Sequence, residues 1–228
     1  MKISDFDAIK KFPFQRSDKS TNEVRLRELD WIMPQISRHG LNLEFGVFSG
    51  ETINHMANLR PDLKFTGFDS FEGLPEDFDA GEKIVPANAF DRDGKPPEVE
   101  DNVTLVKGWF DDTLQLWVDE QLLHQLLGQV KPYISFVNMD ADIYSSTSYV
   151  LNTINDFIKP GTVIRFDELS CWRYVFSEAS SKNIQRVYYT NWKAHEWKAM
   201  NEWLEKYDRK VIPICRNWHQ AATVVVTQ

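Results

Sequence analysis

The end of the chain places the strongest constraint on its fold. Lys210–Cys215 and Ala221–Thr227 both have the apolar, β-branched character of strands, and only the polar link Arg216–Gln220 separates them. Such a link is too short for the crossover helix that joins parallel strands. The two strands must therefore form an antiparallel hairpin.

Upstream of the hairpin, strand-like and helix-like segments alternate, which favours a parallel sheet covered by helices on both faces. The fold class predicted is α/β: a doubly wound, mostly parallel, seven-stranded Rossmann-like sheet that ends in the antiparallel hairpin. The five earlier strands are expected at Leu41–Val47, Lys64–Phe68, Val103–Val106, Tyr133–Met139 and Thr162–Phe166, and the helices at Gly50–Leu59, Leu114–Leu127, Ser145–Ile158 and Asn191–Tyr207.

With 228 residues, the chain is long enough for one full domain and short for two. We expect a single domain over residues 1–228 with an N-terminal helical extension, about 1–39, whose helix runs from Thr21 to Ser37. The segment of about 70–101 holds four prolines and three glycines without periodicity. A loop of that length is unusual in a compact domain, which predicts a lid.

Composition limits the partners and the compartment. The net charge of −8, with no cluster of Lys and Arg, argues against nucleic acid. No apolar run is long enough to span a bilayer, and no secretory signal is visible in Met1–Lys11. Cys171 and Cys215 are the only cysteines, which suits a reducing compartment. We expect a cytoplasmic protein with a small-molecule substrate, and a homo-oligomer is compatible with these features.

A glycine turn follows the first of the parallel strands. Gly46 permits a tight turn and close approach of a ligand, and Gly50 permits close packing of the next helix. Phe48 replaces the middle glycine of the usual pattern, so a plain strand-to-helix turn is an equal alternative. Asp69 ends the next strand, 25 residues after Glu44. A carboxylate there can accept hydrogen bonds from ribose hydroxyls, although a capping aspartate is the simpler alternative.

Acidic pairs close two successive strands. Asp140 and Asp142 follow one strand, and Asp167 and Glu168 follow the next. The carboxyl ends of parallel strands share one edge, so these groups should converge, and their mutual repulsion calls for a positive charge between them. Oxygen ligands suit Mg²⁺, Mn²⁺ or Ca²⁺. Helix capping is the alternative for any single carboxylate, and Asp142 in particular stands ahead of a predicted helix.

Five motifs occur in order along the chain: Glu44–Gly46, Phe68–Pro75, Lys107–Leu114, Met139–Thr147 and Phe166–Glu168. Together they resemble the macrocin O-methyltransferase family, whose better-known members methylate sugar hydroxyls of macrolide antibiotics. The similarity extends over about residues 40–200, and a weaker one extends to catechol and caffeoyl-coenzyme A O-methyltransferases.

The resemblance implies that the chain binds S-adenosylmethionine. Glu44 and Asp69 would hold its amino-acid and ribose parts, with Gly46 and Thr52 at the methionine end. The adenine pocket would come from residues 108–111. The complete implied cofactor set is Glu44, Gly46, Thr52, Asp69, Ser70, Gly108, Trp109, Phe110 and Asp111.

The resemblance also implies a divalent metal, Mg²⁺ or Mn²⁺. Asp140, Asp167 and Glu168 match the metal ligands of the catechol-type enzymes, whose last ligand is typically Asn, so Glu168 is a departure that adds negative charge. Asp142 is either a further ligand or the general base. A metal-bound hydroxyl loses its proton more readily, and a carboxylate can accept that proton.

Two other function classes remain open at this stage. Gly46, Gly50 and Asp69 could also serve an NAD(P)-dependent oxidoreductase, although the hairpin and the acidic pairs count against it. A non-catalytic relative that binds the cofactor is the other alternative. His195, on the last predicted helix near Trp192, is expected to be structural rather than catalytic.

Overall fold

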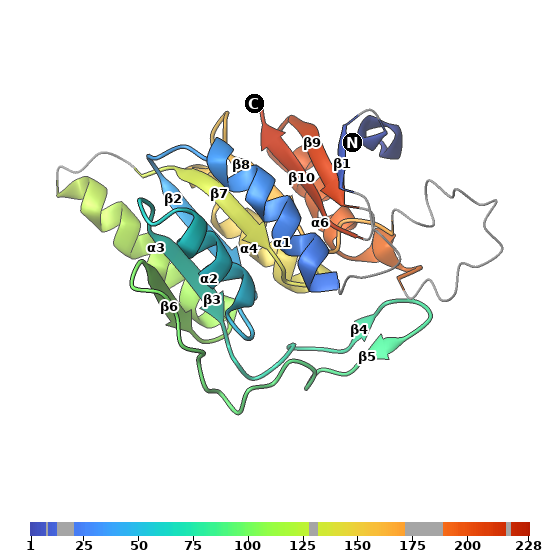
Figure 1. Ribbon diagram of the computed structural model, residues 1–228, viewed down its shortest axis with the longest axis horizontal. Helices are drawn as coiled ribbons and strands as arrows, with labels where there is room; N and C mark the ends of the chain where they lie inside the picture. The colour runs from blue at the N-terminus through green and yellow to red at the C-terminus, as the bar shows by residue number, and fades with distance from the viewer. Residues whose placement is uncertain (8, 13–20, 128–131, 172–188, 218–219) are drawn as a thin grey trace.

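The computed structural model describes residues 1–7, 9–12, 21–127, 132–171, 189–217 and 220–228. These residues form an eight-stranded sheet in the order β1-β9-β10-β8-β7-β2-β3-β6 (Figure 1). The strands are β1 Lys10–Phe12, β2 Leu41–Phe45, β3 Phe65–Asp69, β6 Val103–Lys107, β7 Ile134–Met139, β8 Val163–Phe166, β9 Val211–Asn217 and β10 Ala222–Val226.

The predicted α/β class is confirmed. Strands β2, β3, β6, β7 and β8 pair parallel to one another, and β10 pairs antiparallel with both β8 and β9. The C-terminal hairpin is therefore part of the main sheet, as the short link requires. The strand number differs from the prediction, because Lys10–Phe12 adds an eighth strand that pairs parallel with β9. These three residues lie in the segment predicted as a helical extension. A strand of three residues is too short to show the alternation of apolar and polar residues that predicts a strand.

Helices cover both faces of the sheet, as a doubly wound fold requires. Figure 1 shows α1 and α2 in front of the sheet and α4 and α6 behind it. Helices α1 and α2 contact each other, and α4 contacts both α3 and α6. The bounds are α1 Thr21–Ile32, α2 Glu51–Leu59, α3 Phe110–Leu126, α4 Tyr144–Thr153 and α6 Glu196–Lys206, with short 3-10 turns η1 Ile3–Phe6, η2 Met33–Gln35, η3 Asn155–Phe157 and η4 Trp192–Ala194.

Some helices are shorter than their sequence periodicity predicts. Helix α1 ends at Ile32 and continues only as η2, which contains Pro34, and proline lacks the amide hydrogen that a continuing helix needs. The helix expected from Asn191 begins at Glu196 instead, because His195 is non-helical with φ −112° and ψ −122°. Among the described residues, no helix has both the length and the apolar character to cross a membrane.

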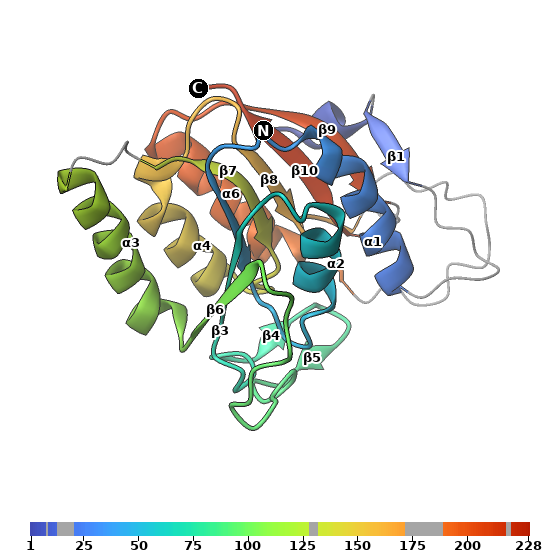
Figure 2. The ribbon, with the colours of Figure 1, turned by 60° about the vertical axis from the view of Figure 1, so that its left-hand side comes forward.

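The segment expected to form a lid contains secondary structure of its own. It includes a small antiparallel hairpin of β4 (Phe78–Asp79) and β5 (Ile84–Val85), separate from the main sheet. Figure 2 shows this segment below α2 and the end of β3. On sequence grounds, the Trp-rich region Trp172–Trp197 is a second candidate to close over an acceptor, and its residues 172–188 lie outside the described residues.

Two hydrophobic cores stabilise the sheet. One fills the α3/α4/α6 side and includes Phe45, Phe68 and Trp203, and the other fills the α1/α2 side and includes Phe65 and Phe136. All six residues of β7 are buried, as expected for a central strand of a sheet that is covered on both faces.

Candidate active site

The carboxyl ends of β2, β3, β7 and β8 meet at one edge and border a cavity of about 630 Å³. Gly46 allows the ends of β2 and β7 to lie this close together. At φ 91° it adopts a left-handed conformation, and a Cβ added there would lie 1.8 Å from the carbonyl oxygen of Asp140. Any side chain at this position would force β2 and β7 apart, so Gly46 is needed for strand packing as well as for ligand approach.

One part of the cavity, here called the cofactor end, contains the residues expected to bind S-adenosylmethionine. All of them except Glu44 line the cavity wall. Those lining residues are Gly46, Thr52, Asp69, Ser70, Gly108, Trp109, Phe110 and Asp111.

Asp69 organises the loops of the cofactor end. Its Oδ2 accepts hydrogen bonds from the backbone amides of Val47 (2.8 Å) and Phe48 (2.7 Å), and its Oδ1 accepts one from Phe71 (2.6 Å). The carboxylate therefore joins the turn after β2 to the turn after β3. The ribose role predicted for Asp69 would add to this structural role, because each carboxylate oxygen can accept more than one hydrogen bond.

Glu44 lies behind the cavity wall and is only 1% exposed. Its Oε1 accepts a hydrogen bond from Asn138 Nδ2 at 2.6 Å, whereas its Oε2 has no hydrogen-bond partner among the described residues. Burial raises the pKa of Glu44 to about 8, and Thr52 and Asn138 offset this only in part. A buried carboxyl with an unpartnered oxygen is suited to a cationic group arriving from the cavity.

The other part, here called the acidic end, consists of Asp140, Asp142, Asp167 and Glu168, which all line the cavity. Arg25 from α1 reaches into this group. Its Nη2 donates to Asp140 Oδ2 at 2.5 Å and also to Asp167 Oδ2, and its Nε donates to Asp167 Oδ1 at 2.8 Å. The positive charge that the clustered carboxylates require is thus supplied in part by the chain itself.

Asp167 differs from its neighbours in its charge environment. Arg165 Nη2 also donates to its Oδ1, at 2.6 Å. Burial would raise the pKa of Asp167, but Arg25 and Arg165 together hold it well below its usual range. By contrast, burial raises the pKa of Asp140 to about 7 despite Arg25, and burial together with the neighbouring carboxylates raises the pKa of Asp142 and Glu168 well above their usual values.

The carboxylates best placed to hold a cation are Asp140, Asp142 and Glu168, whose oxygens can all lie within 4.8 Å of one another. This group contains Asp140 and Glu168 of the predicted ligand set together with Asp142, the predicted further ligand or base. The oxygens of Asp167 already accept from two arginines. Glu168 Oε2 is buried and has no hydrogen-bond partner among the described residues. An orphaned carboxylate oxygen beside two others is compatible with a divalent cation.

Asp142 is held in an unusual backbone conformation. Its φ of 58° lies in the left-handed region, which non-glycine residues seldom adopt and which costs about 1–3 kcal/mol. The turn directs Asp142 into the cavity wall ahead of α4. The predicted helix-cap alternative is not observed, since α4 has Ile143 at its N-cap position and no side-chain capping bond.

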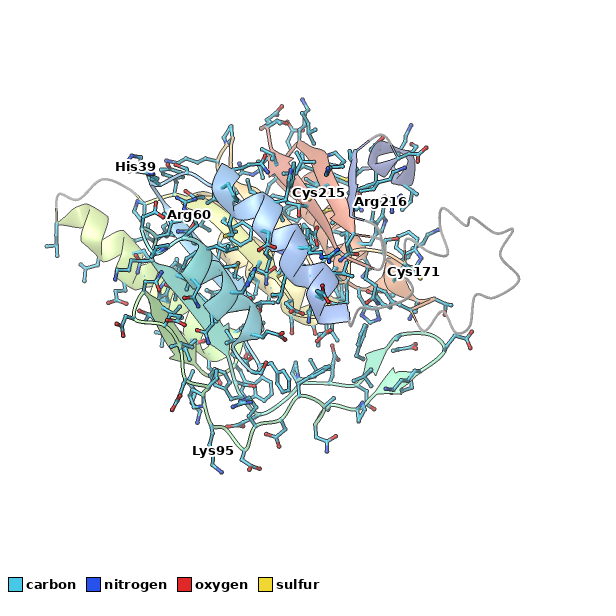
Figure 3. All side chains as sticks on the ribbon, viewed as in Figure 1. His39, Arg60, Lys95, Cys171, Cys215 and Arg216 are labelled. Carbon is cyan, nitrogen blue, oxygen red and sulfur yellow. The ribbon has the colours of Figure 1, made fainter. Side chains whose placement is uncertain are left out.

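A row of buried polar side chains lies behind the acidic end, across the α1-facing side of the sheet. Glu44, Asn138, Arg165, Thr223 and Cys215 are successive register partners on β2, β7, β8, β10 and β9. Cys215 is labelled on β9 in Figure 3. Apolar residues would normally occupy such positions, so the row is a specialised feature of this core.

Glu28 of α1 completes this polar row. It is fully buried and accepts from Arg165 Nε at 3.1 Å and from Thr223 Oγ1 at 3.3 Å. Arg165 Nη1 in turn donates to Asn138 Oδ1 at 2.8 Å. These bonds fix α1 against the sheet and so determine where Arg25, one turn earlier in the same helix, enters the acidic end.

Sequence reasoning did not identify Arg25, Glu28, Asn138, Arg165 or Glu196 as parts of the site. A signal was present, because Asn138 and Arg165 interrupt strands that are mostly apolar. Glu196 is fully buried, and its Oε2 accepts from the backbone amide of Glu168 at 2.9 Å. Polar residues inside buried strands indicate a buried hydrogen-bond network, but they do not show which residues pair within it.

The segment 70–101 borders one side of the cavity and contacts α4 and residues before α6. Ser145 Oγ donates to Glu76 Oε1 at 2.6 Å, and His195 Nε2 lies 2.8 Å from the carbonyl oxygen of Asp79. His195 therefore contacts this segment and is not among the residues that line the cavity. At the mouth, the exposed rings of Phe48 and Phe90 form an edge-to-face pair with centroids 5.5 Å apart.

Comparisons with known proteins identify the family and the fold. The family described as "Methyltransferase domain" matches residues 43–169, more than half of the chain, and the chain belongs to this family. A search of curated proteins finds no significant match.

Several solved structures share the fold. CalS11, a calicheamicin methyltransferase also described as a TDP-rhamnose 3'-O-methyltransferase, has 20% identity and a TM-score of 0.63, covering 91% of this chain and 80% of its own. The O-methyltransferase NovP has 18% identity and a TM-score of 0.55, covering 90% and 80%. The SAH-bound methyltransferase PaMTH1 of Podospora anserina has 15% identity and a TM-score of 0.54, covering 94% and 83%. At such identities the likeness establishes the fold.

Proposed function

We propose that this chain is an S-adenosylmethionine-dependent O-methyltransferase that methylates a hydroxyl of a small molecule, a sugar or a glycosylated natural product, with the help of a divalent cation. One observation carries the proposal. A single cavity joins the cofactor end to the acidic end, so a methyl donor and a hydroxyl could meet between them.

The charge of the cavity favours a cationic cofactor. Among the described residues that line it, Arg25 is the only basic one, whereas eight carry carboxyl groups: Glu51, Asp69, Glu76, Asp111, Asp140, Asp142, Asp167 and Glu168. S-adenosylmethionine carries a sulfonium and an ammonium, which such a field attracts. A pyrophosphate held at the cofactor end, as in NAD(P), would face Asp69 and Asp111 and be repelled. In addition, the amides of Val47 and Phe48 at the glycine turn already donate to Asp69.

Glu44 supports the same cofactor. Its unpartnered Oε2 lies behind Gly46 and Thr52, where the family resemblance places the amino-acid part of S-adenosylmethionine. An ammonium group near Glu44 would favour the ionised carboxylate over the protonated form. We therefore propose that Glu44 releases its proton when the cofactor binds.

At the acidic end, Asp140, Asp142 and Glu168 would hold Mg²⁺ or Mn²⁺. When bound, a divalent cation lowers the pKa of a coordinated hydroxyl and orients it toward the methyl donor. Asp142 contributes one oxygen to the three-carboxylate group, and its other oxygen can accept the proton of the acceptor hydroxyl. Asp167, bound by two arginines, orients Arg25 rather than the substrate.

Polar groups along the cavity support a polyhydroxylated acceptor. Ser145, Tyr149, Asn217 and Gln220 line the cavity and carry hydroxyl and amide groups that can form hydrogen bonds with an acceptor. The resemblance to the macrocin O-methyltransferase family points to the same substrate class, as does the description of CalS11 as a TDP-rhamnose 3'-O-methyltransferase.

Calorimetry and a transfer assay test this function. We expect S-adenosylhomocysteine to bind the purified chain and NAD⁺ not to bind. We also expect methyl transfer from S-adenosylmethionine to a member of a panel of nucleotide sugars and glycosides, lost with EDTA and restored by Mg²⁺. Binding of NAD⁺ alone would favour the oxidoreductase. Binding of S-adenosylhomocysteine without transfer to any panel member would favour a non-catalytic relative, and undiminished transfer in EDTA would remove the metal from the proposal.

A further inference from the structure

Arg25 and a divalent cation would need the same carboxylate. Asp140 belongs to the three-carboxylate group, and its Oδ2 already accepts from Arg25 Nη2 at 2.5 Å. Two cations cannot both approach one carboxylate closely without strong mutual repulsion. Binding of a metal ion to Asp140 must therefore break the hydrogen bond between Arg25 and Asp140.

The three hydrogen bonds of Arg25 are divided unequally between the two aspartates. Two of them go to Asp167 and one goes to Asp140. The guanidinium can release Asp140 and still keep Asp167, which does not belong to the three-carboxylate group. Asp167 is itself fixed by Arg165, so it provides a stationary second position for Arg25.

The helix that carries Arg25 cannot readily move away. Glu28, one turn along α1, is fully buried and bonded to Arg165 and Thr223. The Arg25 side chain, in contrast, is 23% exposed and has several rotatable bonds. Rearrangement at this point should therefore involve the side chain of Arg25 and leave α1 in place.

We propose that Arg25 is an internal counter-cation that competes with the divalent ion for Asp140, binding Asp140 when the ion is absent and withdrawing to Asp167 when the ion enters. This inference rests on the metal site of the proposed function and assigns Arg25 and Asp167 as positioning residues. It explains why the chain places a half-buried arginine among carboxylates that would otherwise repel one another. The competition also keeps the affinity for metal low until other ligands add to it.

The test measures binding of Mn²⁺ alone, by EPR titration and calorimetry, without cofactor or acceptor. Arg25→Gln removes the competing charge and keeps much of the side-chain length. We expect it to bind Mn²⁺ on the order of tenfold more tightly than the wild type at low ionic strength. Arg27→Gln is the matched control, because Arg27 lies on the same helix, is exposed and pairs with Glu23. It should bind Mn²⁺ as the wild type does.

Equal or weaker binding of Mn²⁺ by Arg25→Gln would overturn the competition. Asp140→Asn should weaken Mn²⁺ binding in both the wild type and the Arg25→Gln background, and unchanged binding would place the ion elsewhere and overturn it too. If neither the wild type nor Arg25→Gln binds Mn²⁺, the inference and the metal site both fail. Binding of S-adenosylhomocysteine by the same samples would then show that the cofactor part of the proposed function stands.

A measurement on the wild type keeps the inference testable even if Arg25→Gln does not fold. In crystals soaked with Mn²⁺, we expect an anomalous peak beside Asp140, with Arg25 Nη2 more than about 3.5 Å from Asp140 and still bonded to Asp167. An ion on Asp140 with the Arg25 bond intact would overturn the proposal. So would an ion bound to Asp167 with Arg25 displaced from both aspartates.

Discussion

The two ends of the cavity hold their carboxylates in different ways. At the cofactor end, Asp69 is surrounded by backbone amides from nearby loops. At the acidic end, Asp140 and Asp167 depend on Arg25, a side chain more than a hundred residues away along the chain. Local backbone turns therefore organise the cofactor end, whereas a buried tertiary network organises the acidic end. Substitutions at the cofactor end should therefore change mainly the affinity for the cofactor. Substitutions at the acidic end should change mainly turnover and stability.

Arg165→Met should have the largest effect, because the substitution leaves Glu28 and Asp167 buried without their shared partner. We expect the free energy of unfolding to fall by about 3–5 kcal/mol in urea denaturation. Arg38→Met is the control, because Arg38 is 81% exposed and should contribute less than about 1 kcal/mol. Adding Glu28→Leu should restore part of the loss. A stability within about 1 kcal/mol of the wild type would show that the buried network does not hold the acidic end.

Glu44 should make the stability of the cofactor-free protein depend on pH. Its pKa is about 8 in the folded protein, against an ordinary value of 4.5 in the unfolded chain, so the folded protein binds the proton more tightly. The stabilisation is complete below pH 4.5 and is lost as the pH rises through 8. Relative to Glu44→Gln, the wild type should lose a few kcal/mol across this range, since one pKa unit is worth about 1.4 kcal/mol.

Urea denaturation at several pH values measures this difference. Glu82→Gln, a substitution at an exposed position, serves as the control and should follow the wild type at every pH. Parallel pH profiles for the wild type and Glu44→Gln would mean that Glu44 is ionised in the folded state. The proposed proton release on cofactor binding would then be wrong.

Asp140→Asn and Glu168→Gln should separate turnover from cofactor binding. Both remove a negative charge from the three-carboxylate group. We expect methyl transfer to fall about 100-fold or more, because cation stabilisation of the reacting oxygen is worth several kcal/mol. The dissociation constant of S-adenosylhomocysteine should change by less than about threefold. Asp119→Asn on the surface of α3 is the control, and a parallel loss of cofactor affinity would contradict the separation.

Asp69→Ala, at the cofactor end, should have the opposite effect to the substitutions at the acidic end, because it should change mainly cofactor binding. Loss of an acceptor for the ribose hydroxyls should weaken S-adenosylhomocysteine binding by about 1–3 kcal/mol in calorimetry. Asp101→Ala, in an exposed turn, is the control. Binding of Mn²⁺ should be nearly unchanged in both variants. Unchanged cofactor affinity in Asp69→Ala would limit Asp69 to joining the loops after β2 and β3.

Much of the fold followed from local patterns. The short link Arg216–Gln220 predicted the hairpin, and the alternation of apolar segments predicted the parallel strands. The ends of the helices were less predictable, because Pro34 and His195 make two helices shorter than the spacing of their apolar residues predicts. The strand at Lys10–Phe12 exists because β9 offers it an edge, which is a tertiary property.

The candidate site also has parts that local sequence patterns predict and parts that depend on the tertiary structure. Gly46 and Asp69 could be placed at strand ends from the sequence because strand ends and turns carry strong local preferences, whereas residues 108–111 were proposed only from the family resemblance. The grouping of acidic residues at one edge was also predictable, since parallel strands share a carboxyl edge. Which three carboxylates lie within 4.8 Å of one another was not, because Asp167 is bound by arginines whose positions depend on the packing of α1 and on strand register.

By itself, the sequence determined the order of elements, the shared edge of the strands and the excess of negative charge at that edge. Only the tertiary structure decided how that charge is balanced. Arg25 and Glu28 come from a helix that local preferences cannot orient, and Arg165 comes from a strand whose partners are set by register. Charge–charge energies depend on separation and burial, and neither is encoded in the spacing of residues along a chain.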